Sequence, residues 1–203
     1  MNIEKEVRYQ ASKEIINKII NITSPYKERQ HMMDITFGYD GFNSLSKYGF
    51  ICRIRYKKDK QVMEIKKKIE EGWLEQEINL SNLGEGINFY KLIGMEPYMF
   101  LNRYRETRKF KGLKIFIDEI DIVGDYVEIE FQDSNDAKNE LLEFLKLVGI
   151  QGPEQDLYGD IIKQRLQTDK EFSDKYLSAL NDVIQKYIKE NKYEIWKCFN
   201  RKS

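Results

Sequence analysis

Charged residues recur at every second position in several segments of this chain, and no other feature of the sequence constrains the fold as strongly. Glu4, Glu6 and Arg8 open the series. Alternate side chains of a β-strand point to the same face of the sheet, so each segment predicts a strand with one charged face and one mostly apolar face. The later members of the series are Arg53 and Arg55; Glu64, Lys66 and Lys68; Glu75 and Glu77; Arg103 and Arg105; Lys114 and Asp118; and Glu128 and Glu130.

The pattern of apolar residues, caps and turns predicts an α+β protein with about eight mostly antiparallel strands. Strands are expected at 2–9, 31–37, 49–56, 61–68, 73–80, 98–110, 113–120 and 126–131, with a turn-rich segment from Tyr39. Helices are expected after the N-cap Ser12, from Leu83 to a stop at Gly94, at 135–148, at 158–166, and in an amphipathic segment that carries Phe172, Tyr176, Leu180, Val183 and Tyr187. A sheet of this size tends to close or fold over, which gives it an interior.

Two interpretations of the charged face are open. For any single strand, a solvent-exposed face is the simpler explanation, and it is preferred for Lys67 and for an exposed turn with Arg108, Lys109 and Lys111. However, basic residues gather on some strands and acidic residues on others. A closed sheet would place them around one interior, and such an interior needs a highly charged guest.

Composition excludes several classes of protein. The 203 residues include 34 basic and 34 acidic residues, and this balance argues against a general nucleic-acid or membrane-surface binder. His31 is the only histidine, so neither a histidine metal site nor a serine or cysteine triad can be built in the usual way. Two cysteines, no apolar signal core at Met1 and no long apolar run favour a cytoplasmic protein without membrane spans.

A triphosphate together with a divalent metal is the guest that this set of residues fits. Arginine and lysine bind phosphate oxygens through charge-assisted hydrogen bonds. Carboxylates would repel phosphate unless Mg²⁺ or Mn²⁺ lay between them, and these ions prefer oxygen ligands. A carboxylate could also orient or deprotonate the attacking oxygen.

The ordered motifs resemble the CYTH superfamily, which takes in class IV adenylyl cyclases, thiamine triphosphatases and inorganic triphosphatases. Glu4-x-Glu6-x-Arg8 is similar to the ExExK signature of that superfamily, with arginine in place of the lysine. The motifs that follow in order are Arg53-Ile-Arg55, Glu64-Ile-Lys66, Glu75-x-Glu77, Arg103-x-Arg105, the segment from Asp118 to Gly124 and on to Glu130, and Leu157-Tyr158.

The resemblance implies a closed eight-stranded antiparallel β-barrel, a tunnel for triphosphate, over residues 1–166, with peripheral helices and a helical C-terminal extension at 167–203. By position, the metal ligands would be Glu4, Glu6, Glu75, Glu77, Glu128 and Glu130. The phosphate contacts would be Arg8, Arg53, Arg55, Lys66, Arg103, Arg105 and Lys114. The catalytic set would be Glu6, Arg8, Lys66 and Asp118.

Three functions follow, with Mg²⁺ or Mn²⁺ as cofactor and a triphosphate-bearing small molecule as partner. The leading one is hydrolysis of inorganic triphosphate or a nucleoside triphosphate. The second is a class IV adenylyl cyclase that makes cyclic AMP and pyrophosphate from ATP. The third is a non-catalytic binder of an anionic nucleotide or polyphosphate, which Arg8 in place of lysine keeps open. The apolar face of the last helix would pack on the domain, on a second copy in a homodimer, or over a tunnel opening.

Overall fold

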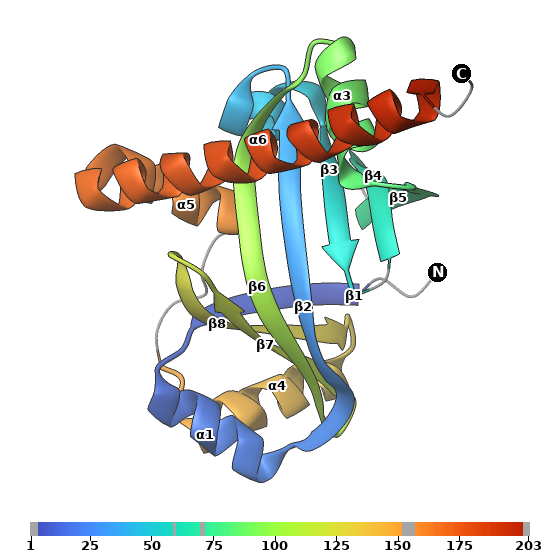
Figure 1. The fold of residues 1–203 in the computed structure, drawn as a ribbon. Coiled ribbons are helices and arrows are strands. Elements are labelled where there is room, and N and C mark those ends of the chain that lie inside the picture. Colours follow the sequence, from blue (N-terminus) through green and yellow to red (C-terminus); the bar gives the residue numbers. More distant parts are fainter. Residues whose placement is uncertain (1–3, 59, 70–71, 152–156, 201–203) are drawn as a thin grey trace. The chain divides into compact units, whose positions relative to one another are not determined.

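The computed structural model describes residues 4–58, 60–69, 72–151 and 157–200, with side chains described for 5–58, 60–69, 74–151 and 157–189. Eight strands follow the hydrogen-bonded order β1-β8-β7-β6-β2-β3-β4-β5. They are β1 (Glu4–Gln10), β2 (Ser24–Gly38), β3 (Phe50–Lys57), β4 (Lys60–Ile69), β5 (Gly72–Asn79), β6 (Glu96–Phe110), β7 (Leu113–Ile120) and β8 (Gly124–Gln132) (Figure 1). The α+β class and the eight-stranded antiparallel sheet are confirmed. Closure of that sheet into a tunnel stays a prediction.

The helices are α1 (Lys13–Ile22), α2 (Ser44–Tyr48), α3 (Leu83–Leu92), α4 (Asn135–Val148), α5 (Tyr158–Thr168) and α6 (Lys170–Asn200), with a 3₁₀ turn η1 (Gly41–Asn43). The side chains of Ser12, Asn82 and Ser134 accept hydrogen bonds from backbone amides in the first turns of α1, α3 and α4, as N-caps do. Gly149 ends α4 in the left-handed conformation, which glycine adopts without strain. The peripheral helices and the helical C-terminal segment are therefore confirmed.

The chain forms two compact units. Unit 1 contains Met1–His31 and Asn102–Ile161, and unit 2 contains Met32–Leu101 and Ile162–Ser203. The expected division into residues 1–166 and 167–203 follows the extent of the family resemblance rather than compactness, and it stays a prediction.

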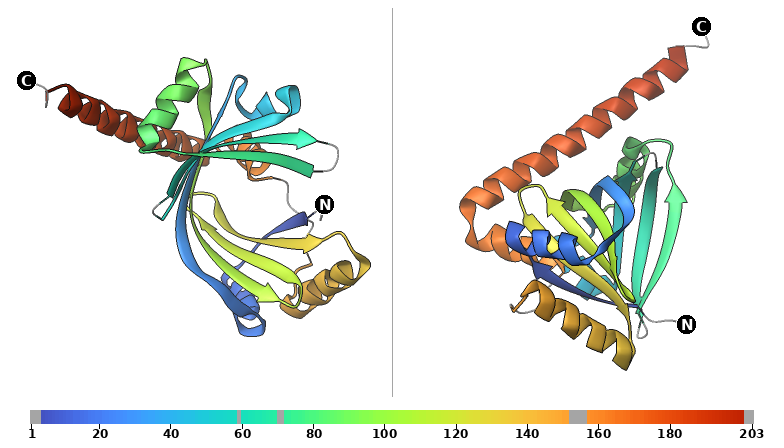
Figure 2. Two further views of the ribbon diagram at one scale, coloured as in Figure 1. Left: turned by 90° about the vertical axis from the view of Figure 1, so that its right-hand side faces the viewer. Right: turned by 90° about the horizontal axis from the view of Figure 1, so that it is seen from below.

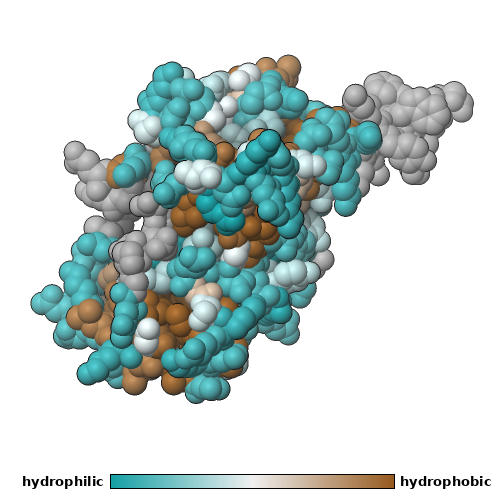
Figure 3. All heavy atoms as spheres, turned by 90° about the vertical axis from the view of Figure 1, so that its left-hand side faces the viewer, coloured by the Kyte–Doolittle hydropathy of each residue, from teal (hydrophilic) through white to brown (hydrophobic). Residues whose placement is uncertain are grey.

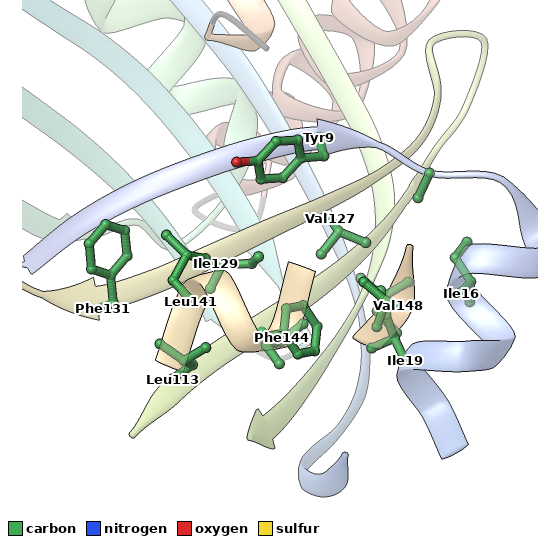
Figure 4. Packing of buried hydrophobic residues seen from close by; sticks show 13 residues of the cluster. Tyr9, Ile16, Ile19, Leu113, Val127, Ile129, Phe131, Leu141, Phe144 and Val148 are labelled. Atoms are coloured by element: carbon green, nitrogen blue, oxygen red, sulfur yellow. The ribbon is translucent and has the colours of Figure 1, made fainter. Parts of the chain in front are cut away.

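Unit 1 packs one face of β1, β7 and β8 against α1 and α4, which lie along that face in each view of Figures 1 and 2. The apolar parity of the strands supplies the core, and Figure 4 shows Leu113 and Ile129 of the strands in one cluster with Leu141 and Phe144 of α4. Each fully buried aliphatic or aromatic side chain contributes about 1.5–3 kcal/mol to the free energy of folding. Because side chains alternate, the charged parity of the same strands must point to the opposite face.

Unit 2 packs α3 against β3 and β4 on one side and against α6 on the other. Gly86 lets α3 approach closely, since a Cβ there would lie 2.9 Å from Cδ1 of Ile54. The hydroxyl of Tyr176 on α6 accepts a hydrogen bond from the amide of Phe100 and donates one to its carbonyl. The predicted amphipathic face of the last helix is thus buried at Phe172, Tyr176 and Leu180.

Three local expectations differ from the structure. Strand β2 begins at Ser24 rather than His31, and the turn-rich segment after Tyr39 contains η1 and α2. Arg108 is buried rather than exposed, because its guanidinium donates to the carbonyls of Ile20 and Thr23 and so satisfies the end of α1. Lys109 and Lys111 are exposed as expected.

Hydrophilic atoms cover most of the molecular face in Figure 3, with hydrophobic atoms between them. In unit 1, Ile20, Ile22, Leu142 and Leu147 contribute partly exposed apolar side chains. Within the described residues, no helix combines the length and the apolar character that crossing a membrane requires.

Candidate functional site

The charged face of unit 1 is built from directly opposed residues on four neighbouring strands. Arg105 of β6 lies opposite Asp118 of β7, and Arg8 of β1 lies opposite Glu128 of β8. Glu130 of β8 is opposed by Lys114 on one side and by Glu6 on the other. Directly opposed side chains in antiparallel strands share a face and lie close together, so register alone gathers these charges.

Asp118 is the centre of the first group of contacts. Arg105 donates to both of its oxygens, from Nε at 2.7 Å and from an Nη at 2.6 Å. Arg103 adds a guanidinium nitrogen at 3.7 Å from the same carboxylate. Asp118 is fully buried, and a buried carboxylate of this kind is stable only when it is paired and hydrogen-bonded.

Glu128 is the centre of the second group. Its oxygens lie 2.6 Å from a guanidinium nitrogen of Arg8 and 3.1 Å from one of Arg105. Burial opposes ionisation of Glu128, but the charges of Arg105 and Arg8 outweigh it and lower the pKa of the carboxyl to about 2. For Arg105, burial is likewise opposed by Asp118 and Glu128, which raise its pKa well above the ordinary value. The group is therefore fully ionised at neutral pH.

Three carboxylates form a group that could hold a metal ion. One oxygen each from Glu6, Glu128 and Glu130 lies within 4.8 Å of the other two. The side chain of Glu6 is 46% exposed and that of Glu130 is 25% exposed, whereas Glu128 is buried. Carboxylate oxygens are the ligands that Mg²⁺ and Mn²⁺ prefer, so the donor set fits the expected cofactor. Glu6 and Glu130 would be its accessible part.

Tyr158, the first residue of α5, lies on this charged face. Its hydroxyl donates to Asp118 at 2.9 Å, and its ring centroid lies 4.3 Å from Cζ of Arg8. Tyr126 packs edge-on against this ring, with 5.3 Å between the two ring centroids. Burial, followed by the charges of Asp118 and Glu128, raises the pKa of Tyr158 well above its ordinary value, which keeps the hydroxyl protonated as a donor.

Unit 2 carries a second charged face of its own, built on β2, β3 and β4. Arg55 donates to both oxygens of Asp34, at 2.6 and 2.8 Å. Arg53 lies 3.9 Å from the same carboxylate. Asp34 is as deeply buried as Asp118, so a buried aspartate with a two-pronged arginine occurs in both units.

Glu64 is the second buried carboxylate of unit 2. It lies 2.5 Å from Arg53, 3.7 Å from Arg55 and 3.9 Å from Lys66. Lys66 also pairs with Glu75, the residue opposite it on β5. Burial of Glu64 shows that it is not part of a solvated cluster with Lys67 and Lys68, which are exposed.

The predicted site residues thus divide between the two units. Unit 1 brings together Glu6, Arg8, Arg103, Arg105, Lys114, Asp118, Glu128 and Glu130. Unit 2 brings together Arg53, Arg55 and Lys66 and also holds Glu75 and Glu77, the latter paired with Lys60 at 2.8 Å. Glu4 lies on β1 opposite Gln132, and its side chain is outside the described part of the chain. The roles assigned to all of these residues stay predictions.

Sequence reasoning missed Asp34, Glu64 and Tyr158 as members of these groups. Asp34 carried a signal, because a lone carboxylate inside the apolar run from Met32 to Phe37 predicts a buried partner. Glu64 belongs to the charged series through its spacing with Lys66, but no role was assigned to it. The contacts of Tyr158 had no signal, since they depend on where the start of α5 packs.

Comparison with known proteins finds solved structures with a similar fold. No family model matches the sequence, and no curated protein matches it either. Among solved structures, the PH1819 protein of Pyrococcus horikoshii OT3 aligns with a TM-score of 0.65 and 21% identity, over 80% of this chain and 99% of that one. A protein of Vibrio parahaemolyticus, provisionally assigned as an adenylate cyclase, aligns with a TM-score of 0.59 and 16% identity, over 80% of this chain and 98% of that one.

A third similar structure has a described activity. HpAC1 from Hippeastrum, provisionally assigned as an adenylyl cyclase and described as having a dominant triphosphatase activity, aligns with a TM-score of 0.53 and 19% identity. The alignment covers 78% of this chain and 91% of that one. The chain has the fold of these proteins. The resemblance stated from the sequence is therefore confirmed as a likeness of fold.

Proposed function

We propose that this protein processes a triphosphate in a metal-dependent reaction at the charged face of unit 1, and that the reaction is hydrolysis of inorganic triphosphate or a nucleoside triphosphate. The observation that carries the proposal is the grouping of Glu6, Glu128 and Glu130 within 4.8 Å, with Arg8 and Arg105 on Glu128. Clustered carboxylates alone would repel a polyanion, and clustered arginines alone would not recruit a metal.

Substrate binding would fall to the guanidinium groups. Arg8, Arg103 and Arg105 are held by buried carboxylates, so binding of phosphate oxygens would cost them little further side-chain freedom. Arginine suits this role because its planar fork matches phosphate geometry. Lys114, partly exposed at the end of the same face, would contribute charge.

Glu6, Glu128 and Glu130 would hold Mg²⁺ or Mn²⁺. When bound, the ion would supply positive charge that offsets charge on the phosphate oxygens. Glu6 is the most exposed of the three and is the carboxylate that could orient the attacking water. Asp118, enclosed by Arg105 and Tyr158, would act by holding Arg105 in place rather than by exchanging a proton with substrate.

A second candidate function is that of a class IV adenylyl cyclase, in which the ribose hydroxyl of ATP attacks the α-phosphate and pyrophosphate leaves. The similar structures provisionally assigned as adenylate cyclases favour it. It needs the same metal and phosphate contacts and, in addition, a pocket for base and ribose. Binding of an anionic nucleotide without turnover is the third candidate.

One assay separates the three. Purified protein is incubated with inorganic triphosphate, ATP or thiamine triphosphate, each with Mg²⁺, Mn²⁺ or EDTA, while phosphate, pyrophosphate and cyclic AMP are followed together. Phosphate release that EDTA abolishes is the expected result. Cyclic AMP with equal pyrophosphate would replace hydrolysis by cyclisation, and saturable binding of these compounds without any product would leave the binding function.

A further inference from the structure

Contacts of different chemistry hold Arg8 in unit 1, from the carboxylates of Glu128 and Glu6 and from the ring of Tyr158. Glu128 contacts one of its guanidinium nitrogens at 2.6 Å, and the face of the Tyr158 ring lies 4.3 Å from its Cζ. Glu128 also belongs to the carboxylate group that fits a metal ion, whereas the tyrosine ring is neutral and binds no such ion. The two contacts must therefore respond differently when a divalent cation arrives.

Tyr158 is itself firmly placed. It is 6% exposed, its hydroxyl donates to the fully buried Asp118, and Tyr126 packs edge-on against its ring. Arg103 lies farther out, with Cζ 5.9 Å from the ring centroid. A cation over an aromatic face is attracted by the ring quadrupole, and the attraction grows when the pair is removed from water.

We propose that Tyr158 is a positioning residue of the unit 1 site, which keeps Arg8 in place for phosphate while Glu128 is shared with a divalent cation. The proposal rests on the proposed function for the identity of the anion. The ring holds the guanidinium from its face, so the N–H groups in the guanidinium plane stay directed at their partners. The hydroxyl ties the same ring to Asp118 and thereby to Arg105.

The test separates the ring from the hydroxyl and both from general stability. Tyr158→Phe keeps the ring and removes the bond to Asp118, whereas Tyr158→Leu removes both. Tyr176→Phe is the matched control, because it deletes another buried tyrosine hydroxyl in unit 2, where that hydroxyl bonds to Phe100. If Tyr158→Leu does not fold, Tyr158→Met removes the ring while keeping apolar volume.

The first readout needs no activity. In ¹H–¹⁵N spectra, the side-chain Nε–H signal of Arg8, assigned by its loss in Arg8→Lys, carries the ring-current shift of Tyr158. We expect Tyr158→Phe and Tyr176→Phe to leave that shift in place and Tyr158→Leu to abolish it. Added Mg²⁺ should broaden the Arg8 signal in Tyr158→Leu but not in the wild type. An Arg8 signal that is unchanged in Tyr158→Leu would overturn the proposal.

The second readout is binding and turnover of inorganic triphosphate with Mg²⁺. An attraction of this kind corresponds to about a tenfold effect on binding, so Tyr158→Leu should raise KM about tenfold with little change in kcat. Tyr158→Phe should raise KM less, and Tyr176→Phe should leave it unchanged. Equal effects of Tyr158→Leu and Tyr176→Phe would make Tyr158 merely structural. If the wild type neither binds nor turns over triphosphate, the proposed function fails while the spectra still decide the contact with Arg8.

Discussion

The two units share one arrangement of buried charged residues and differ in the carboxylates around it. In each unit a buried aspartate receives a two-pronged arginine, Asp118 with Arg105 in unit 1 and Asp34 with Arg55 in unit 2. In each, a buried glutamate, Glu128 or Glu64, contacts that same arginine and at least one other cationic side chain. Unit 1 adds two partly exposed carboxylates, Glu6 and Glu130, which form a group of three with Glu128. In unit 2, the glutamates of β5 are paired with lysines, as Glu130 is with Lys114 in unit 1, but among the described residues they do not form such a group of three.

This difference separates holding cations from recruiting a metal. A buried carboxylate that neutralises arginines fixes their geometry, and both units do this. A metal ion also needs carboxylate oxygens gathered at one point, and among the described residues unit 1 supplies such a group at Glu6, Glu128 and Glu130. Unit 2 therefore has a set of cationic side chains held by buried carboxylates, here called its cation platform. Unit 1 has such a platform together with the carboxylates of Glu6 and Glu130, here called its metal-binding edge.

The largest expected effects come from neutralising the buried aspartate that occurs in both units. Asp34→Asn and Asp118→Asn each remove the buried charge that receives two hydrogen bonds from an arginine, which costs about 3–5 kcal/mol of unfolding free energy. Asp118→Asn should cost about 1 kcal/mol more, because it also weakens the bond from Tyr158. Denaturant unfolding measures both. Asp40→Asn, at an exposed pair with Lys47, is the control and should cost under about 1 kcal/mol. A small effect at Asp34 alone would end the equivalence of the two units.

Acid should weaken unit 1 through Glu128. Its pKa is about 2 in the folded protein, below its ordinary value of 4.5, so its stabilising contribution is complete above pH 4.5 and is lost as the pH falls toward 2. The shift corresponds to about 3 kcal/mol. Without divalent metal, unfolding of Glu128→Gln should show a flatter pH dependence over this range than the wild type. Glu119→Gln, on the opposite parity of β7, should keep the wild-type slope, and equal slopes for all three proteins would contradict the assignment.

The metal-binding edge is tested by Glu6→Gln, which changes unit 1 at the point where it differs from unit 2. Loss of one carboxylate from the group of three should lower Mn²⁺ affinity and triphosphate turnover by about 100-fold. Because Glu6 is half exposed, metal-free thermal stability should hardly change. Electron paramagnetic resonance of Mn²⁺ gives the affinity independently of turnover. Wild-type affinity in the variant would remove Glu6 from the metal site, and Glu119→Gln serves again as the unaffected control.

The existence of the eight strands, the N-cap Ser12 and the charged parity could be predicted, since they depend on local spacing, whereas the start of β2 could not. The alternation around Lys114 and Glu128 indicated both the buried face and the charged face of unit 1. Contacts that depend on tertiary packing could not be predicted. Arg108 looked like a turn residue, but its guanidinium satisfies the carbonyls at the end of α1, and no spacing rule links those two segments. Tyr158 was named only in the Leu157-Tyr158 motif and its partner could not be predicted, because its contact with Arg8 joins residues 150 positions apart in the sequence.

The smallest expected effect is that of a test for phosphate binding by the cation platform of unit 2. Lys66 and Lys67 are adjacent on β4 but lie on opposite faces, so they form a matched pair. If Lys66 contacts phosphate as predicted, Lys66→Met should weaken inorganic triphosphate binding about tenfold, the value of one charge-assisted hydrogen bond. Lys67→Met, at an exposed position on the other face, should leave binding unchanged. Calorimetric titration of both variants measures the difference. Wild-type affinity in Lys66→Met would assign Lys66 to the fold through Glu64 and Glu75, and would leave phosphate recognition to the arginines of unit 1.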